Sequence, residues 1–157
     1  EKIKGEDEFK RTLTNISSLP PLTPENIIKK FTEITSCKII EKTNTHKIAL
    51  ATIDKKIMHQ GLSLIENFMS DGDFSLITVL IILEGHENIN DLSTVMWKIL
   101  NNIDPKRDIY LFKNRIGIDV TCKTGEKNYA QIWPDEITMS NQIIKTVDQK
   151  WKKMFNE

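Results

Sequence analysis

The chain has 157 residues, enough for one domain with a buried core, and its 22 basic residues balance its 22 acidic residues. This neutrality argues against a nucleic-acid-binding protein, because such proteins usually carry a basic surplus that neutralises phosphates. The longest apolar run, residues 76–83, is too short for a transmembrane segment. The two cysteines form no CxxC pair and are typical of a reducing compartment, so we expect a soluble, cytoplasmic globular domain.

Residues 1–22 have the composition of a connection to another domain. The segment is charged at first and ends in Pro20 and Pro21, which cannot continue a helix and usually mark a linker. The sequence also begins with Glu1 rather than Met. We therefore expect a piece of a larger protein, with a lead-in at 1–22 and a folded domain at 23–157.

Helix and strand patterns alternate through the first half of the domain. A threonine N-cap followed by a proline at the first helical position predicts a helix at 24–34. A short strand is expected at 38–42, and a run of β-branched and apolar residues predicts a firmer one at 45–53. Apolar residues at helical spacing then predict a helix at 56–69.

The second half continues the alternation. The unbroken apolar run at 76–83 has the length of a central strand that is covered on both faces. Further patterns predict a helix from 90 or 91 to about 100, strands at 109–112 and 116–121, and a last helix at 140–155. The chain is therefore expected to form an α/β or mixed α+β fold, with a central mixed sheet and helices on both faces.

The loop at 84–91 is the richest polar cluster, and it follows the central strand, where α/β folds build sites. His86, Glu87 and Asp91 are residue types that hold cations, yet the loop has neither an EF-hand rhythm nor HExxH spacing. A solvated loop that ends in a helix N-cap at Asn90 or Asp91 explains the same residues.

Other reactive side chains are isolated in the sequence. His46 and His59 lack a Ser or Cys nucleophile in an elbow-like context. Lys123 can lower the pKa of the neighbouring Cys122 thiol, but a packed thiol at the end of a strand is the simpler interpretation. The residues by themselves therefore assign no catalytic, cofactor-binding or metal-binding side chain.

The turn at 104–108 combines two carboxylates with two cations. We expect Asp104 to accept hydrogen bonds from its own turn backbone and Arg107 to pair with Asp108 or Asp104. This interpretation is structural, since the composition of the turn indicates no chemistry.

The last helix carries a stripe of large apolar residues that includes Trp151 and Phe155. Such a stripe packs into the core of its own domain or anchors a partner subunit, and the sequence does not decide between these two interpretations.

Several stretches, taken in order, resemble the C-terminal domain of the UbiD-type decarboxylases, the polyprenyl-hydroxybenzoate carboxy-lyases and their relatives. The matching pieces are residues 46–56, the strand up to Leu83, 90–99 with "VMWKI", 103–108 with "IDPKRD", 116–123 with "IGIDVTCK", and Trp133-Pro134 leading into the last helix. The resemblance extends from about residue 24 to 155, and the intervals between its pieces make it specific.

The resemblance implies a parent enzyme that removes CO2 non-oxidatively from an aromatic or unsaturated acid, with prenylated FMN, Mn²⁺ and K⁺ as cofactors. The family's catalytic Arg-Glu-Asp/Glu group and flavin pocket belong to an upstream flavin-binding domain. No catalytic, cofactor-binding or metal-binding residue is therefore carried over to this chain, which we expect to be inactive and without cofactor when alone.

The resemblance also implies what this domain does for its parent. In the family, the C-terminal domain covers the active site by hinge motion and forms much of the subunit interface. We therefore expect a homo-oligomer that is held together through the C-terminal helix with Trp151 and Phe155. Ubiquinone or menaquinone synthesis is the best-known setting, with peripheral contact to the inner membrane where the substrate is polyprenylated.

Two departures from the family pattern stand out. A long loop that family members usually have is reduced here to 113–115, and an acidic stretch is weakened to 84–88. The substrate is therefore not carried over. The alternative to a decarboxylase domain is a stand-alone binding or assembly module that has the same fold and no decarboxylase activity.

Overall fold

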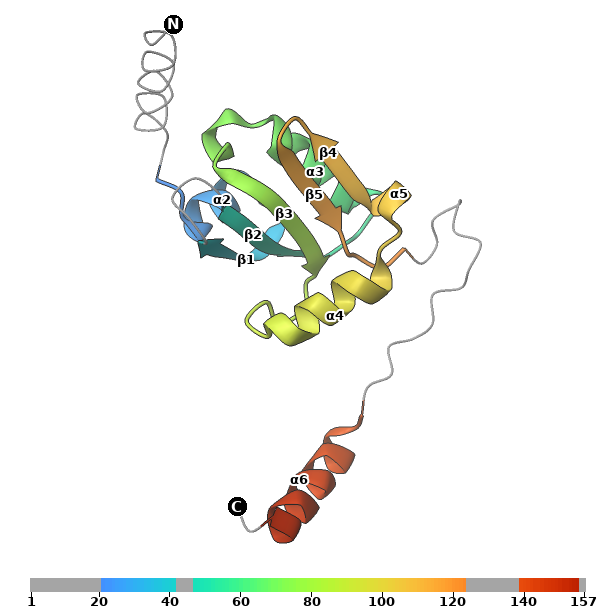
Figure 1. The fold of residues 1–157 in the computed structure, drawn as a ribbon. Helices are drawn as coiled ribbons and strands as arrows, with labels where there is room; N and C mark the ends of the chain where they lie inside the picture. The colour runs from blue at the N-terminus through green and yellow to red at the C-terminus, as the bar shows by residue number, and fades with distance from the viewer. Residues whose placement is uncertain (1–20, 42–46, 124–138, 156–157) are drawn as a thin grey trace, which may run out of the picture.

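A five-stranded mixed sheet forms the centre of the computed structural model, which describes residues 21–41, 47–123 and 139–155 (Figure 1). The strands lie side by side in the order β1–β2–β3–β5–β4. Their bounds are Ile34–Glu41 for β1, Lys47–Ile53 for β2, Ile77–Glu84 for β3, Ile109–Phe112 for β4 and Arg115–Asp119 for β5. The three inner strands are parallel, whereas the edge strands β1 and β4 pair antiparallel.

One face of the sheet, here called the back face, is covered by α2 (Pro24–Lys30), α3 (Gln60–Ser70) and the short 3-10 helix η1 (Gly72–Phe74). The aromatic rings that fill this core are those of Phe31, Phe68 and Phe74, with centroids 5.0, 5.8 and 5.4 Å apart. Burial of these large rings stabilises this side of the sheet together with the buried aliphatic residues of the same core.

Close packing of α3 on β5 depends on a glycine. A Cβ atom added at Gly117 would lie 2.1 Å from Cγ2 of Ile65, far inside van der Waals contact. A larger residue at this position would push α3 away from the sheet.

The opposite, front face carries α4 (Leu92–Asn102), which packs Val95 and Ile99 against the ends of the inner strands. Figure 1 shows that α4 lies at one end of the sheet and leaves the rest of this face without a helix. The short helix α5 (Pro105–Asp108) then leads into β4. Helices on both faces of a mixed sheet confirm the predicted fold class.

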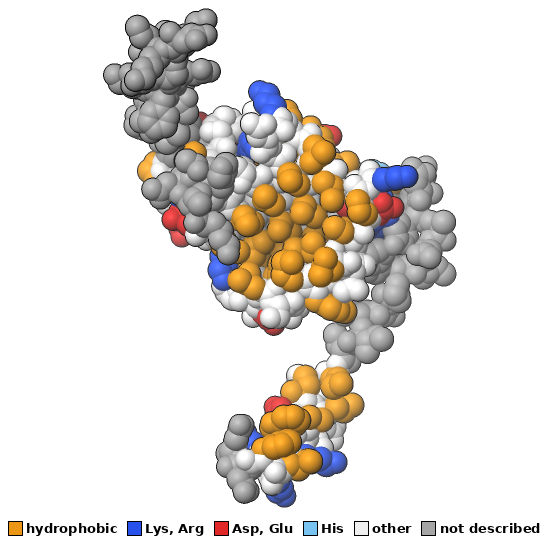
Figure 2. Space-filling model, in the orientation of Figure 1, with side chains coloured by type: hydrophobic (Ala, Val, Ile, Leu, Met, Phe, Trp, Pro, Cys, Tyr) orange, Lys and Arg blue, Asp and Glu red, His pale blue; other side chains and the backbone are white. Residues whose placement is uncertain are grey.

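The uncovered part of the front face is apolar. Strand pairing places five residues in one row across all five strands, namely Leu111, Ile116, Val79, Ile48 and Ile40. We call these residues the open face. Leu111 is 72% exposed and Ile116 is 38% exposed, and Figure 2 shows the apolar side chains gathered over the sheet.

The predicted last helix is present as α6 (Asn141–Phe155), and none of its residues is buried. Trp151 and Phe155 are both about half exposed, and their rings contact each other with centroids 4.5 Å apart. Core packing of this stripe within its own chain is therefore not found. Within the described residues, no helix has the length and hydropathy needed to cross a bilayer.

Two predicted helices have different starts and ends in the structure. The helix expected at 24–34 ends at Lys30, and Ile34 instead opens β1, because this β-branched residue pairs with Ile53 of β2. The helix expected at 56–69 begins at Gln60, since His59 has a left-handed φ of 56° that interrupts a helix. Residues 1–20 of the expected lead-in lie outside the described residues.

Arg115 joins the back-face elements to β5. Its guanidinium donates to the carbonyl oxygens of Met69, Phe74 and Ile77 at 2.7, 2.8 and 2.7 Å. These carbonyls belong to the end of α3, to η1 and to the start of β3. Burial lowers the pKa of Arg115, and the negative charge of Asp71 partly opposes this shift.

Replacing Arg115 with Met should lower the free energy of unfolding by about 2–4 kcal/mol, because three buried carbonyls lose their donors. Urea denaturation followed by circular dichroism measures the loss. Lys106→Met, at an exposed position, should change stability by less than about 0.5 kcal/mol. Equal effects of the two substitutions would contradict the role given to Arg115.

Candidate functional site

The carboxyl ends of β2, β3 and β5 lie at the same edge of the sheet, since these strands are parallel. Three polar segments leave the sheet at this edge, residues 54–56, 84–91 and 119–123. This is the edge at which open α/β sheets build their sites.

Four charged side chains form a chain of ion pairs at this edge, and three of the four are buried. Arg107 donates Nε and one terminal nitrogen to Asp108, both at 2.6 Å. The Nζ of Lys123 lies 3.8 Å from Asp108 and 2.7 Å from Asp119. Asp108, Asp119 and Lys123 are each at least 95% buried, and with the half-buried Arg107 their two negative and two positive charges balance.

Asp119 also shapes the backbone that follows β5. Its Oδ1 accepts from the amide of Thr121 at 3.0 Å and from the Thr121 hydroxyl at 2.7 Å. The carboxylate lies against the first turn of α3, where a Cβ atom on Gly61 would be 2.5 Å from Oδ1. Glycine at this position therefore allows the carboxylate and the helix to share this space.

Side chains at the ends of two other strands hold the backbone of Cys122. The amide of Cys122 donates to Glu84 at 2.7 Å, and its carbonyl accepts from Nζ of Lys55 at 2.6 Å. Lys55 follows β2, and Glu84 ends β3. We call a set of five side chains the exit cluster: Lys55, Glu84, Asp108, Asp119 and Lys123. The exit cluster fixes the path of the chain as it leaves the sheet.

The loop at 84–91 was expected to hold a cation or to end in a helix N-cap. Asp91 is the N-cap of α4 and accepts from the amides of Ser93 and Thr94, which confirms the capping prediction. Glu87 pairs with the buried Lys98 at 2.5 Å. Within the described residues, no group of three or more His, Cys, Asp or Glu side chains is placed to hold a metal ion.

The side chains of the exit cluster bond to one another or to the peptide groups of Cys122. No buried side-chain nitrogen or oxygen of the described residues lacks a hydrogen-bond partner. A flavin or metal site needs donors or acceptors that converge on open space, whereas these side chains bond one another or the Cys122 backbone. The cluster therefore fits a rigid support for the strand ends and does not fit a cofactor-binding site.

Of the other candidates from the sequence, Lys123 belongs to the exit cluster, where its ammonium is directed to Asp119 and Asp108. The rest lie apart from this cluster or outside the described part. Asp104 accepts from the amide of Lys106, as predicted for this turn. The short connection expected at 113–115 is a two-residue hairpin turn of Lys113 and Asn114 at the opposite end of β5, because Arg115 already pairs with Phe112; Lys113 has a φ of 52°. His46 lies outside the described residues.

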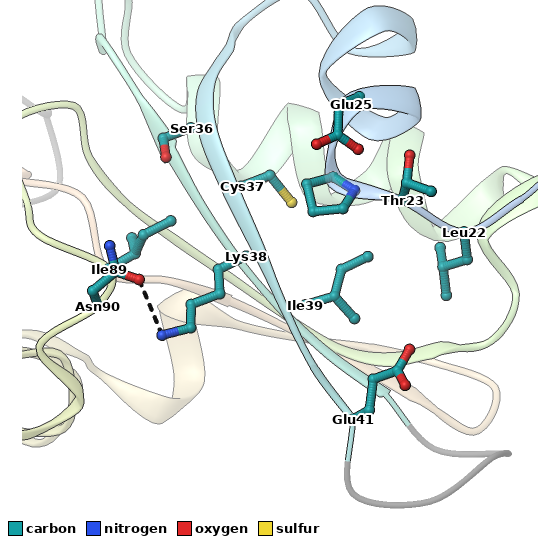
Figure 3. A pocket seen from close by; sticks show the side chains of 11 residues that line it. Leu22, Thr23, Glu25, Ser36, Cys37, Lys38, Ile39, Glu41, Ile89 and Asn90 are labelled. Atoms are coloured by element: carbon teal, nitrogen blue, oxygen red, sulfur yellow. Dashed lines mark hydrogen bonds between the residues drawn. The ribbon is translucent and has the colours of Figure 1, made fainter.

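A second feature is a groove of about 510 Å³ along the outer edge of β1 (Figure 3). Cys37 points toward α2, whereas Lys38 points the other way and donates to Asn90 at 3.1 Å. Burial raises the pKa of the Cys37 thiol to about 12, and the nearby Glu25 carboxylate adds to the shift. A thiol that stays protonated near pH 7 is a poor nucleophile, so the groove offers no cysteine chemistry.

Residues 14–131 match the family model of the 3-octaprenyl-4-hydroxybenzoate carboxy-lyase C-terminal domain, called UbiD_C. The match covers well over half of the chain and contains the sheet and the exit cluster. The chain belongs to this family. Helix α6 lies beyond the matched residues, so the family model itself says nothing of it.

Relatives of this UbiD_C chain are longer proteins. It is 23% identical over 128 residues to an uncharacterized protein of Archaeoglobus fulgidus, covering 71% of this chain and 27% of that protein. It is 26% identical over 125 residues to one of Aquifex aeolicus, covering 69% of this chain and 26% of that protein. The chain therefore spans about a quarter of the length of these relatives.

Solved structures share the fold. The vanillic acid decarboxylase of Sedimentibacter hydroxybenzoicus, in closed form, gives a TM-score of 0.65 at 10% identity, covering 85% of this chain and 31% of that chain. The UbiD-class enzyme HmfF of Pelotomaculum thermopropionicum, in complex with FMN, gives a TM-score of 0.53 at 16% identity. The match covers 79% of this chain and 31% of that chain. Both confirm the UbiD-type fold.

Replacing Lys123 with Met should lower the free energy of unfolding by roughly 3–5 kcal/mol, because two buried carboxylates lose their shared cation. Lys30→Met is the control, since Lys30 pairs with Asp71 and Asp73 on the surface and should matter much less. Urea denaturation measures both variants. A loss at Lys123 no larger than that at Lys30 would show that the exit cluster is not a stabilising network.

Cys37 should react very slowly with iodoacetamide in the folded chain, because a pKa of about 12 leaves roughly one thiolate in ten thousand at pH 8. In a Cys122→Ser background, mass spectrometry should show labelling at least about 100-fold slower than in urea. The rate should rise about tenfold for each pH unit between 8 and 11. A plateau near pH 9 would contradict the burial of this thiol.

Proposed function

We propose that this chain is the C-terminal domain of a UbiD-type decarboxylase that removes CO2 from an aromatic or unsaturated carboxylic acid. Family membership over residues 14–131 is the observation that carries this proposal. The shared fold with vanillic acid decarboxylase and HmfF supports it. The setting that we propose is ubiquinone or menaquinone synthesis in the cytoplasm, at the inner membrane where the substrate is polyprenylated.

Prenylated FMN, Mn²⁺ and K⁺ belong, in this proposal, to an upstream flavin-binding domain of the parent protein. The residues described here fit that division, because Lys123 pairs with Asp108 and Asp119, and Lys55 and Glu84 bond the Cys122 backbone. No catalytic step is therefore assigned to a side chain of this domain.

The proposed role of the domain is to cover the active site as one rigid body. The likeness of this chain to vanillic acid decarboxylase is nearly the same for the open and closed forms of that enzyme, with TM-scores of 0.63 and 0.65. Such agreement is expected when a domain moves without refolding. The hydrogen bonds of Lys55 and Glu84 to the Cys122 backbone favour this behaviour, since they tie the ends of β2 and β3 to the segment that follows β5.

We propose a second role in assembly, through α6. Its apolar stripe with Trp151 and Phe155 is exposed in the single chain, and exposed aromatic stripes of this kind often bind a partner subunit. The same observation favours the alternative function, a binding or assembly module without decarboxylase activity. Decarboxylase activity of the parent protein distinguishes the decarboxylase domain from the assembly module.

Release of CO2 from a panel of aromatic acids tests the proposal. The parent protein, reconstituted with prenylated FMN, Mn²⁺ and K⁺, should be active, because cofactor and cover are then both present. This chain purified alone should show neither flavin absorbance nor decarboxylation. A parent that lacks residues 23–157 should keep its flavin absorbance and lose at least about 100-fold in rate, since closure of the site is lost.

Two results would contradict the proposal. A yellow and active preparation of the chain alone would place the chemistry in this domain. A parent protein that binds no flavin and acts on none of the acids would support the assembly module instead.

A further inference from the structure

No further inference is drawn: the strongest candidate, the groove that runs along the outer edge of β1 between the start of α2 and the loop at 84–91, carries none, because nothing in the structure shows which ligand or segment would occupy it.

Discussion

Three carbonyl oxygens from different elements converge on the guanidinium of Arg115, at the amino end of β5. The connection from β2 to the parallel strand β3 passes through α3 and η1. Between the end of α3 and the start of β3, the only regular element is the three-residue helix η1. A charged donor with a fixed planar geometry can bind three carbonyls at once, which an ammonium group of lysine cannot do with the same geometry. The placement of α3 against Gly117, and of β3 between its neighbours, depends on this contact.

The two ends of the parallel strands are fixed by different chemistry. Arg115 binds neutral carbonyls at the amino end, whereas the exit cluster at the carboxyl end balances buried charges of both signs. Removing one member of such a cluster leaves an uncompensated charge, so its members must act together. A domain held in this way at both ends resists internal deformation, and this is the property that a rigid cover over an active site requires.

Local signals in the sequence predicted the elements well. The sequence predicted the strand at 109–112 and the N-caps Thr23 and Asp91, because each depends on residues only a few positions away. The pairing of Arg107 with Asp108 is local for the same reason. Arg115 and the contact between Lys123 and Asp108 were missed, since their partners are 15 to 46 residues away and no spacing rule connects them. The resemblance indicated the family but carried no site residue, because the matching stretches form the sheet and its exits.

The open face and the exit cluster lie at opposite halves of the same strands, so a change in one half need not disturb the other. Contacts over Leu111 and Ile116 reach the amino half, away from the ion pairs that fix Asp119 and Lys123. The carboxyl edge, with its polar loops, is therefore held independently of the exposed apolar row at the amino half, and neither region requires the strands to change register.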